Sequence, residues 1–326
     1  MAKVAERTAR QTDLVGALKM MMLIRRFEER AAEAYARSKI KGFLHLYIGQ
    51  EAVAVGAVGA LRPNDYVISH YREHGHILAR GSDPGAVMAE LYGKQTGVTG
   101  GRGGSMHLFD VERRFMGGYA IVAGHLPTAC GLAIACQARG EGDLVLCIFG
   151  DGAVNEGEFH EALNLAAVWK LPVLFLCENN LYGMGTAVER VSAVEEVYKR
   201  ARAYEIPSDR VDGMDYFRVR EAVLNASEQI RAGQGPYFLE ALTFRYRGHS
   251  MADAELYRDK DEVTEWRARD AIEGMRRELD ESGVLGEGEF DRLQSEVDDE
   301  VERAAAFAEE SPEPPLESLH QKVYAD

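Results

Sequence analysis

Two polar turns directly follow two of the most apolar stretches in the chain. The run LVLCIF at 144–149 precedes GDGAVNEG, and the run VLFLC at 173–177 precedes ENNLYGMGT. Short apolar runs of this kind are typical of buried parallel strands, and the helical stretch 158–168 between them indicates a crossover connection. Because a right-handed crossover directs both strands the same way, we expect Asp151 and Asn180 at one edge of the sheet, where open parallel sheets bind ligands.

The chemistry of these two turns indicates a metal ion and a diphosphate. The glycines of GDGAVNEG open a helix after a strand, as in a dinucleotide-binding loop, but Asp151 stands between the first two. A carboxylate there would repel a diphosphate unless a divalent cation lay between them, and Mg²⁺ takes oxygen ligands of protein and phosphate together. Asn180 and the backbone carbonyl of Tyr182 offer further protein oxygens. Either turn alone is more often only a chain reversal, and the two together indicate the metal ion and the diphosphate.

The composition argues against several other classes of protein. The 326 residues carry a formal net charge of −15, and 251–326 hold 24 acidic against 9 basic residues. Acidity without a basic stripe argues against nucleic-acid partners. No apolar run approaches the roughly 20 residues of a membrane span, and the start of the chain lacks the apolar segment of a secretory signal, so we expect a cytoplasmic location. The four cysteines show no metal-ligand spacing and are expected to be reduced core residues.

The remaining pattern predicts an α/β protein, with a mostly parallel sheet flanked by helices. Apolar residues at helical spacing predict a helix over 13–38, and the stretches 217–233 and 236–244 predict a further helix and strand. The glycine-rich segments 97–107 and 117–127 are expected to be long loops.

The C-terminal part is expected to be an extension of this sheet domain. After residue 260 the pattern predicts two acidic amphipathic helices, separated near 283–289. We therefore expect an N-terminal helical arm (1–40), a cofactor-binding α/β domain (41–260) and an acidic helical extension (261–326).

Several motifs, taken with the two turns, resemble one known family. GDG followed about thirty residues later by NN is similar to the thiamine diphosphate motif. From about residue 13 to its end, the chain resembles the alpha subunits of the decarboxylating first component of pyruvate and other 2-oxo acid dehydrogenase complexes. The motifs that carry this resemblance are GFLHLYIGQEA (42–52), YREHGH (71–76), GGRGGSMH (100–107), GDGAVNEGEFHEALNLAAVWKLP (150–172), ENNLYGMGT (178–186), RVDGMD (210–215), RYRGHSM (245–251) and SPEPPLE (311–317).

The resemblance implies a thiamine diphosphate-binding fold, like the diphosphate-binding domain of transketolase, and a set of cofactor contacts. It implies Mg²⁺ held by Asp151, Asn180 and the Tyr182 carbonyl. The other implied cofactor contacts are Gly150, Gly152, Ala153, Tyr71 and Arg72 at the diphosphate, and the backbone from Ala120 to Val122, where small side chains permit close contact, near its central part.

Two histidines match active-site positions of the family. The resemblance implies that His249 hydrogen-bonds the diphosphate or helps acyl transfer, and that His45 lies on the substrate side. Other histidines that could line the same cavity are His74, His76, His107 and His125. Ser250 aligns with a serine that mitochondrial relatives phosphorylate, but its loop is shorter here, so we expect an unmodified serine.

The resemblance also implies partners. The glutamate that activates thiamine diphosphate is expected on a beta subunit, in an assembly of two alpha and two beta chains, with acetyl transfer to the lipoyl group of an acyltransferase. ENNLYGMGT and RVDGMD favour pyruvate as the 2-oxo acid. The alternatives are an acetoin or branched-chain 2-oxo acid dehydrogenase, a nicotinamide-dependent dehydrogenase, disfavoured by the glycine spacing and Asp151, and a non-catalytic assembly subunit.

Overall fold

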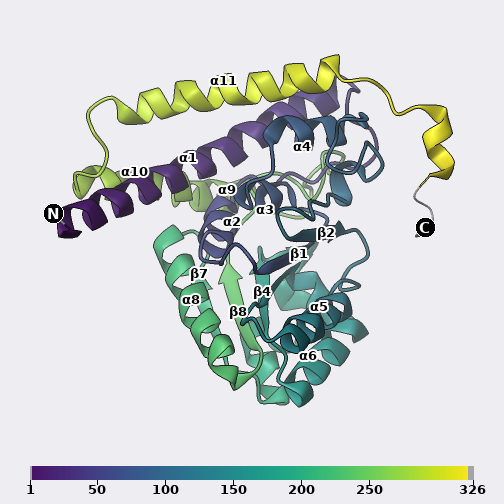
Figure 1. Cartoon of the computed structure of the whole chain (residues 1–326), viewed down its shortest axis with the longest axis vertical. Coiled ribbons are helices and arrows are strands. Elements are labelled where there is room, and N and C mark those ends of the chain that lie inside the picture. The colour runs from purple at the N-terminus through teal and green to yellow at the C-terminus, as the bar shows by residue number, and fades with distance from the viewer. Residues whose placement is uncertain (1, 322–326) are drawn as a thin grey trace.

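Six parallel strands form the centre of the molecule in the computed structural model, which describes residues 2–321, with side chains from residue 13 (Figure 1). The order across the sheet is β2-β1-β3-β4-β8-β7, with all neighbours parallel. The strands are β1 (Tyr66–His70), β2 (Phe115–Tyr119), β3 (Val145–Gly150), β4 (Val173–Asn179), β7 (Ser208–Asp212) and β8 (Tyr237–Leu242). The predicted parallel α/β fold class is confirmed.

Helices cover both faces of the sheet. The α-helices of the sheet region are α2 (Glu51–Val58), α3 (His74–Ala79), α4 (Pro84–Leu91), α5 (Leu126–Arg139), α6 (Gly157–Trp169), α7 (Val188–Val191) and α8 (Tyr216–Gln229). Alternate residues of β3 enter different cores: Leu146 and Ile148 lie in the core shared with α1 (Ala2–Ala36), α2 and α8, whereas Cys147 and Phe149 lie in the core under α5 and α6. Burial on both faces explains why this strand reads as a continuous apolar run.

Shorter elements connect these layers. A two-residue hairpin, β5 (Tyr182–Gly183) with β6 (Thr186–Ala187), follows β4. The remaining short helical turns are Gly104–Met106, Asp151–Asn155, Val197–Tyr204, Ile230–Gln234 and Leu316–His320. None of the described helices is long and apolar enough to cross a membrane. All four cysteines are buried and free, as predicted.

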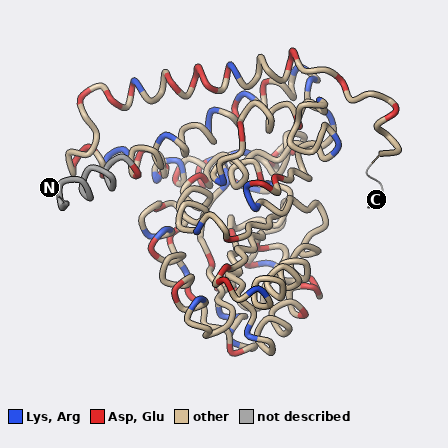
Figure 2. Tube along the Cα trace, viewed as in Figure 1, with Lys and Arg blue, Asp and Glu red and all other residues tan. Residues whose placement is uncertain are grey.

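The N-terminal helix packs against the last long helix of the chain. The C-terminal helices are α9 (Lys260–Arg267), α10 (Ala271–Glu281) and α11 (Glu289–Glu310), and α11 lies along α1 and α4 (Figure 1). Acidic residues are frequent along α11 (Figure 2), and ion pairs join this helix to α1: a carboxyl oxygen of Asp298 lies 2.8 Å from an Arg26 nitrogen, and one of Glu296 lies 3.0 Å from the Lys19 nitrogen. The acidic excess of the C-terminal sequence is therefore partly balanced by the N-terminal helix.

Two details of the predicted element pattern are wrong. The segment 117–127 is not a continuous loop, because β2 includes Gly117 and Gly118 and α5 begins at Leu126. The glycines are required there: a Cβ on Gly117 would lie 2.1 Å from the Phe109 ring, and φ at Gly117 is +107°. The C-terminal part forms three helices, because a break at 268–270 separates α9 from α10.

The segment 97–107 is a loop, as predicted, apart from the short helical turn Gly104–Met106, and one carboxylate organises most of it. Glu90 is fully buried near the end of α4. Its carboxylate accepts hydrogen bonds from the backbone N–H groups of Thr99, Gly101, Gly103 and Gly104, with N···O distances of 2.7–3.1 Å. These hydrogen bonds to one carboxylate replace the backbone hydrogen bonds that a helix or strand would provide.

Candidate active site

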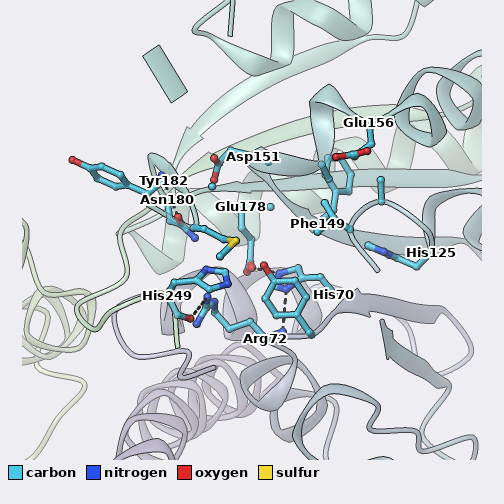
Figure 3. Close-up of a pocket in the computed structure, with 18 residues that line it drawn as sticks. His70, Arg72, His125, Phe149, Asp151, Glu156, Glu178, Asn180, Tyr182 and His249 are labelled. Atoms are coloured by element: carbon cyan, nitrogen blue, oxygen red, sulfur yellow. Dashed lines mark hydrogen bonds and ion pairs between the residues drawn. The ribbon is translucent and has the colours of Figure 1, made fainter. Parts of the chain in front are cut away.

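A cavity opens at the carboxyl edge of the sheet, where β1, β3 and β4 end (Figure 3). Its walls come mainly from 70–72 at the end of β1, 122–125 before α5, 149–153 at the β3 turn, 180–184 after β4, and His249. The two polar turns therefore meet at one site, as the strand directions predicted.

Asp151 and Asn180 both line this cavity. Asp151 is buried, and burial raises the pKa of its carboxyl to about 6. The Asn180 side-chain nitrogen donates to Gln50 at 3.1 Å, and its oxygen faces the backbone N–H of Tyr182 at 3.4 Å. A buried carboxylate beside amide and carbonyl oxygens is a donor set that suits Mg²⁺, so the residues present fit such an ion.

The turns themselves leave room for a phosphate group. Gly150, Gly152 and Ala153 line the cavity, and a Cβ on Gly150 would have no atom within 4 Å. A Cβ on Gly152 would lie only 3.7 Å from the Gly183 Cα, which shows how closely the β3 turn and the β5 hairpin approach. Among the described residues, no three histidine, cysteine, aspartate or glutamate side chains form a metal cluster, and the predicted ligand set contains only one such side chain.

Tyr71 and Arg72 also line the cavity, directly after β1. Arg72 is buried, and its guanidinium donates to the backbone carbonyls of Leu46 and His249, each at 2.8 Å. Two of its nitrogens are thus engaged with the chain itself. A diphosphate contact by Arg72 stays a prediction, and the observed contacts join the segments that carry His45 and His249.

His45, Tyr71 and His249 form an aromatic cluster. The His45 ring centroid lies 4.5 Å from that of Tyr71 and 5.0 Å from that of His249. Burial, followed by the charge of Arg72, lowers the pKa of His249 to about 3 and that of His45 to about 2. Both imidazoles are therefore neutral near pH 7. His249 lines the cavity, and His45 lies behind it against Tyr71.

The other predicted histidines are divided between the cavity and its surroundings. His125 lines the cavity, and its Nε2 lies 2.8 Å from the Ile148 carbonyl oxygen. His76 lies deeper, against Glu178, and His74 is paired with Glu28 of α1 at 3.0 Å. His107, in the loop before β2, contacts the backbone carbonyl of Gly118 within β2.

The segment before α5 only partly matches its prediction. Val122 and Ala123 line the cavity, whereas Ala120 is outside the set of residues that forms its wall. The roles of Ala120 and Val122 toward a cofactor stay predictions. Ser250 is half-buried beside His249, and its modification is likewise untested.

Sequence reasoning missed several residues of the cavity wall. These are His70, Ala123, Phe149, Glu156, Glu178, Gly183 and Met184. Phe149 and Glu178 belong to the strand ends themselves, so the rule that strand ends carry ligands extends one or two residues back into β3 and β4. His70 adjoins the predicted YREHGH motif, but its own contacts with Glu178 depend on long-range packing.

Comparison with known proteins shows the family. A family model described as the dehydrogenase E1 component matches residues 19–317. With the parallel sheet and the site at its carboxyl edge, this match defines the chain as a thiamine diphosphate-binding α/β protein. The chain belongs to the dehydrogenase E1 component family, and the family implies dependence on thiamine diphosphate.

Curated relatives are similar over nearly the whole chain. The pyruvate dehydrogenase E1 component subunit alpha of Rhizobium meliloti (strain 1021) is 47% identical over 312 residues, which cover 95% of this chain and 90% of the relative. The protein of the same name from Zymomonas mobilis is 45% identical over 97% of this chain and 89% of its own. The somatic mitochondrial subunit alpha of Rattus norvegicus is 43% identical over 94% and 78%. The predicted resemblance is confirmed.

Proposed function

We propose that this chain is the alpha subunit of a pyruvate dehydrogenase E1 component, which decarboxylates pyruvate and transfers the acetyl group to a lipoyl acceptor. The observation that carries the proposal is the meeting of Asp151 and Asn180 in one cavity with the 150–153 turn. Relatives named pyruvate dehydrogenase E1 component subunit alpha support pyruvate as the substrate.

The residues of the cavity would divide the cofactor between them. Asp151, Asn180 and the Tyr182 carbonyl would hold Mg²⁺, and Gly150, Gly152 and Ala153 would face the diphosphate. When bound there, thiamine diphosphate would supply a carbon nucleophile for the 2-oxo group and an electron sink for decarboxylation. The neutral imidazole of His249 can donate or accept one hydrogen bond at the cavity wall, and His45 and Tyr71 fix its position by packing.

The proposal includes a beta subunit, in a two-alpha, two-beta assembly, and a lipoyl-bearing acyltransferase. Three apolar side chains stand exposed at or beside the cavity: Ile121 (73%), Val122 (41%) and Met184 (65%). Exposed apolar groups around a ligand cavity favour coverage by another chain. Glu178 is engaged by Tyr47, His70 and His76, which supports an activating glutamate supplied from elsewhere. We propose a cytoplasmic location.

The substitution Asp151→Ala tests the metal and cofactor site. It should remove Mg²⁺-dependent binding of thiamine diphosphate, because the remaining ligands are neutral oxygens, while the assembly and its circular dichroism stay unchanged. Isothermal titration of the assembled enzyme measures the binding. Asp209→Ala, at an exposed position of β7, is the matched control and should bind normally. Wild-type affinity in the Asp151 variant would refute the proposed ligand set.

The substrate is tested separately. The chain, recovered with its partner from native extract, should reduce an artificial electron acceptor with pyruvate only when thiamine diphosphate and Mg²⁺ are both present. Activity with acetoin or a branched-chain 2-oxo acid in place of pyruvate would keep the cofactor site and change the substrate. Absence of any cofactor-dependent activity would favour a non-catalytic subunit.

A further inference from the structure

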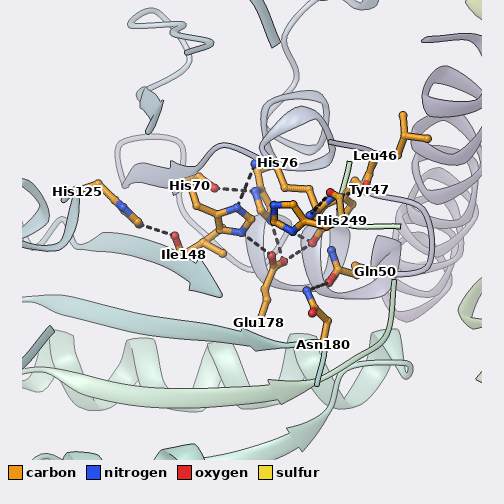
Figure 4. Close-up of polar contacts among 12 residues, drawn as sticks. Leu46, Tyr47, Gln50, His70, His76, His125, Ile148, Glu178, Asn180 and His249 are labelled. Atoms are coloured by element: carbon orange, nitrogen blue, oxygen red, sulfur yellow. Dashed lines mark hydrogen bonds and ion pairs between the residues drawn. The ribbon is translucent and has the colours of Figure 1, made fainter. Parts of the chain in front are cut away.

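A buried carboxylate in the cavity wall is contacted by three side chains (Figure 4). Glu178, 1% exposed near the end of β4, is contacted by Tyr47 and His76 at one oxygen and by His70 at the other. The two histidine contacts are each 2.9 Å long, and Ser69 contacts the far nitrogen of His76 at 2.9 Å. This Glu178 cluster connects β4 with β1, α3 and the segment before α2.

His70 joins the Glu178 cluster to the turn that follows β1. Its Nδ1 lies 3.1 Å from the backbone nitrogen of Arg72. Because a backbone N–H can only donate, Nδ1 must be the unprotonated acceptor, so a neutral ring carries its proton on Nε2 and donates it to Glu178. Burial lowers the pKa of His70, which is consistent with the neutral ring.

Arg72 extends this connection to two other segments of the site. Its guanidinium donates to the carbonyls of Leu46 and His249 at 2.8 Å. A displacement of the Arg72 backbone would therefore move the contacts of the loop that carries His249. The order of contacts is Glu178 to His70, His70 to the Arg72 backbone, and the Arg72 side chain to His249.

We propose that His70, oriented by Glu178, is a positioning residue of the cofactor site, which fixes the backbone at Tyr71 and Arg72 and, through Arg72, the loop of His249. A carboxylate that sets the tautomer of a histidine is the arrangement by which outer partners orient residues that touch a ligand. The identity of the ligand rests on the proposed function, but the hydrogen bond to Arg72 is independent of it.

Two substitutions of His70 distinguish the roles of its two ring nitrogens. Asparagine can place its amide oxygen near the position of Nδ1, whereas glutamine reaches the position of Nε2 and leaves Nδ1 without a substitute. Hydrogen exchange of the full-length chain, without added ligand, should show faster exchange at the Arg72 amide in His70→Gln, on the order of tenfold. His70→Asn should restore protection toward that of the wild type.

Cofactor affinity supplies the second readout. In the assembled enzyme, His70→Gln should weaken thiamine diphosphate binding on the order of tenfold, with a much smaller change of kcat at saturating cofactor, because positioning rather than chemistry is lost. His70→Asn should recover most of the affinity. Leu78→Ala, in the buried core of α3, is the control for a general loss of stability and should leave the affinity unchanged.

The outcomes distinguish this inference from the proposed function. If the wild type binds thiamine diphosphate but His70→Gln and His70→Asn behave alike in both readouts, the positioning role is overturned and the proposed function stands. If affinity falls equally in the Leu78→Ala control, the effect is one of stability and the inference also fails. If the wild type itself does not bind the cofactor, the proposed function fails. Independently of that result, the inference is overturned if hydrogen exchange at the Arg72 amide is the same in His70→Gln as in the wild type.

Discussion

At His125 the lowered pKa makes stability depend on pH. Burial lowers the pKa of this imidazole from 6.5 to about 3. Between pH 6.5 and pH 3 the unfolded chain therefore binds a proton at His125 that the folded chain does not bind. The contribution of the neutral His125 to the free energy of unfolding is thus complete above pH 6.5 and is lost as the pH falls toward 3. At pH 5 the loss for this one residue is about 2 kcal/mol.

The substitution His125→Gln tests this dependence, since it keeps a donor toward the Ile148 carbonyl. Urea unfolding should show a smaller fall in stability between pH 7.5 and pH 5 than in the wild type. A residual fall is expected, because His45 and His249 also have lowered pKa values. Identical pH dependence in the two proteins would contradict the assignment.

Residues were predictable where their position followed from strand direction. Asp151 and Asn180 follow apolar runs, so sequence placed them at one edge, and the cavity brings them together. The buried hydrogen bonds of Glu178 were not predictable, because their donors, such as His70 and Tyr47, lie about 100 or more residues away in the sequence. Their approach depends on the order of strands in the sheet, which the sequence pattern does not specify.

At the scale of elements, the edge strand β2 depends on the absence of a side chain. A Cβ on Gly118 would lie 1.9 Å from a carboxyl oxygen of Glu73, which is itself fully buried. We expect Gly118→Ala to lower the free energy of unfolding by about 1–3 kcal/mol, as overpacking does. Urea unfolding followed by circular dichroism measures this change.

Gly131→Ala is the matched control for that substitution. Gly131 is exposed within α5, and a Cβ there would have no atom within 4 Å. Alanine should therefore stabilise the helix by about 0.5–1 kcal/mol. Equal effects of the two substitutions would show that the contact between Gly118 and Glu73 is unimportant.

The central strands were predictable, and β2 was not, for a physical reason. β3 and β4 are buried on both faces and read as apolar runs. β2 reads FMGGY, and its glycines are typical of a loop, although here they accommodate Phe109 and Glu73. Tertiary contacts, rather than local propensity, decide that segment. A similar limit applies to α9, whose eight residues have no buried side chain to give a clear pattern.

At the scale of the whole molecule, the C-terminal helix is part of the main core. Val301 of α11 is fully buried, and α11 packs against α1 and α4. We expect Val301→Ala to lower the free energy of unfolding by about 1–3 kcal/mol and to shift a single cooperative thermal transition. The division into an arm, a sheet domain and an extension stays a prediction.

Differential scanning calorimetry checks the effect of Val301→Ala. Arg303→Ala, on the exposed face of the same helix, should leave the transition in place. If the Val301 variant moved a separate, smaller transition and left the main one unchanged, the extension would be an independent folding unit.

The Glu90 carboxylate has a consequence for tolerance to mutation. Four backbone N–H groups between 99 and 104 end on this one side chain. Substitutions of exposed side chains such as Arg102 leave those four contacts in place, whereas a change at Glu90 removes them all. Tolerance to substitution in this segment is therefore uneven. In a mutational scan, the largest loss of stability would be found at Glu90, which lies outside the loop whose backbone it holds.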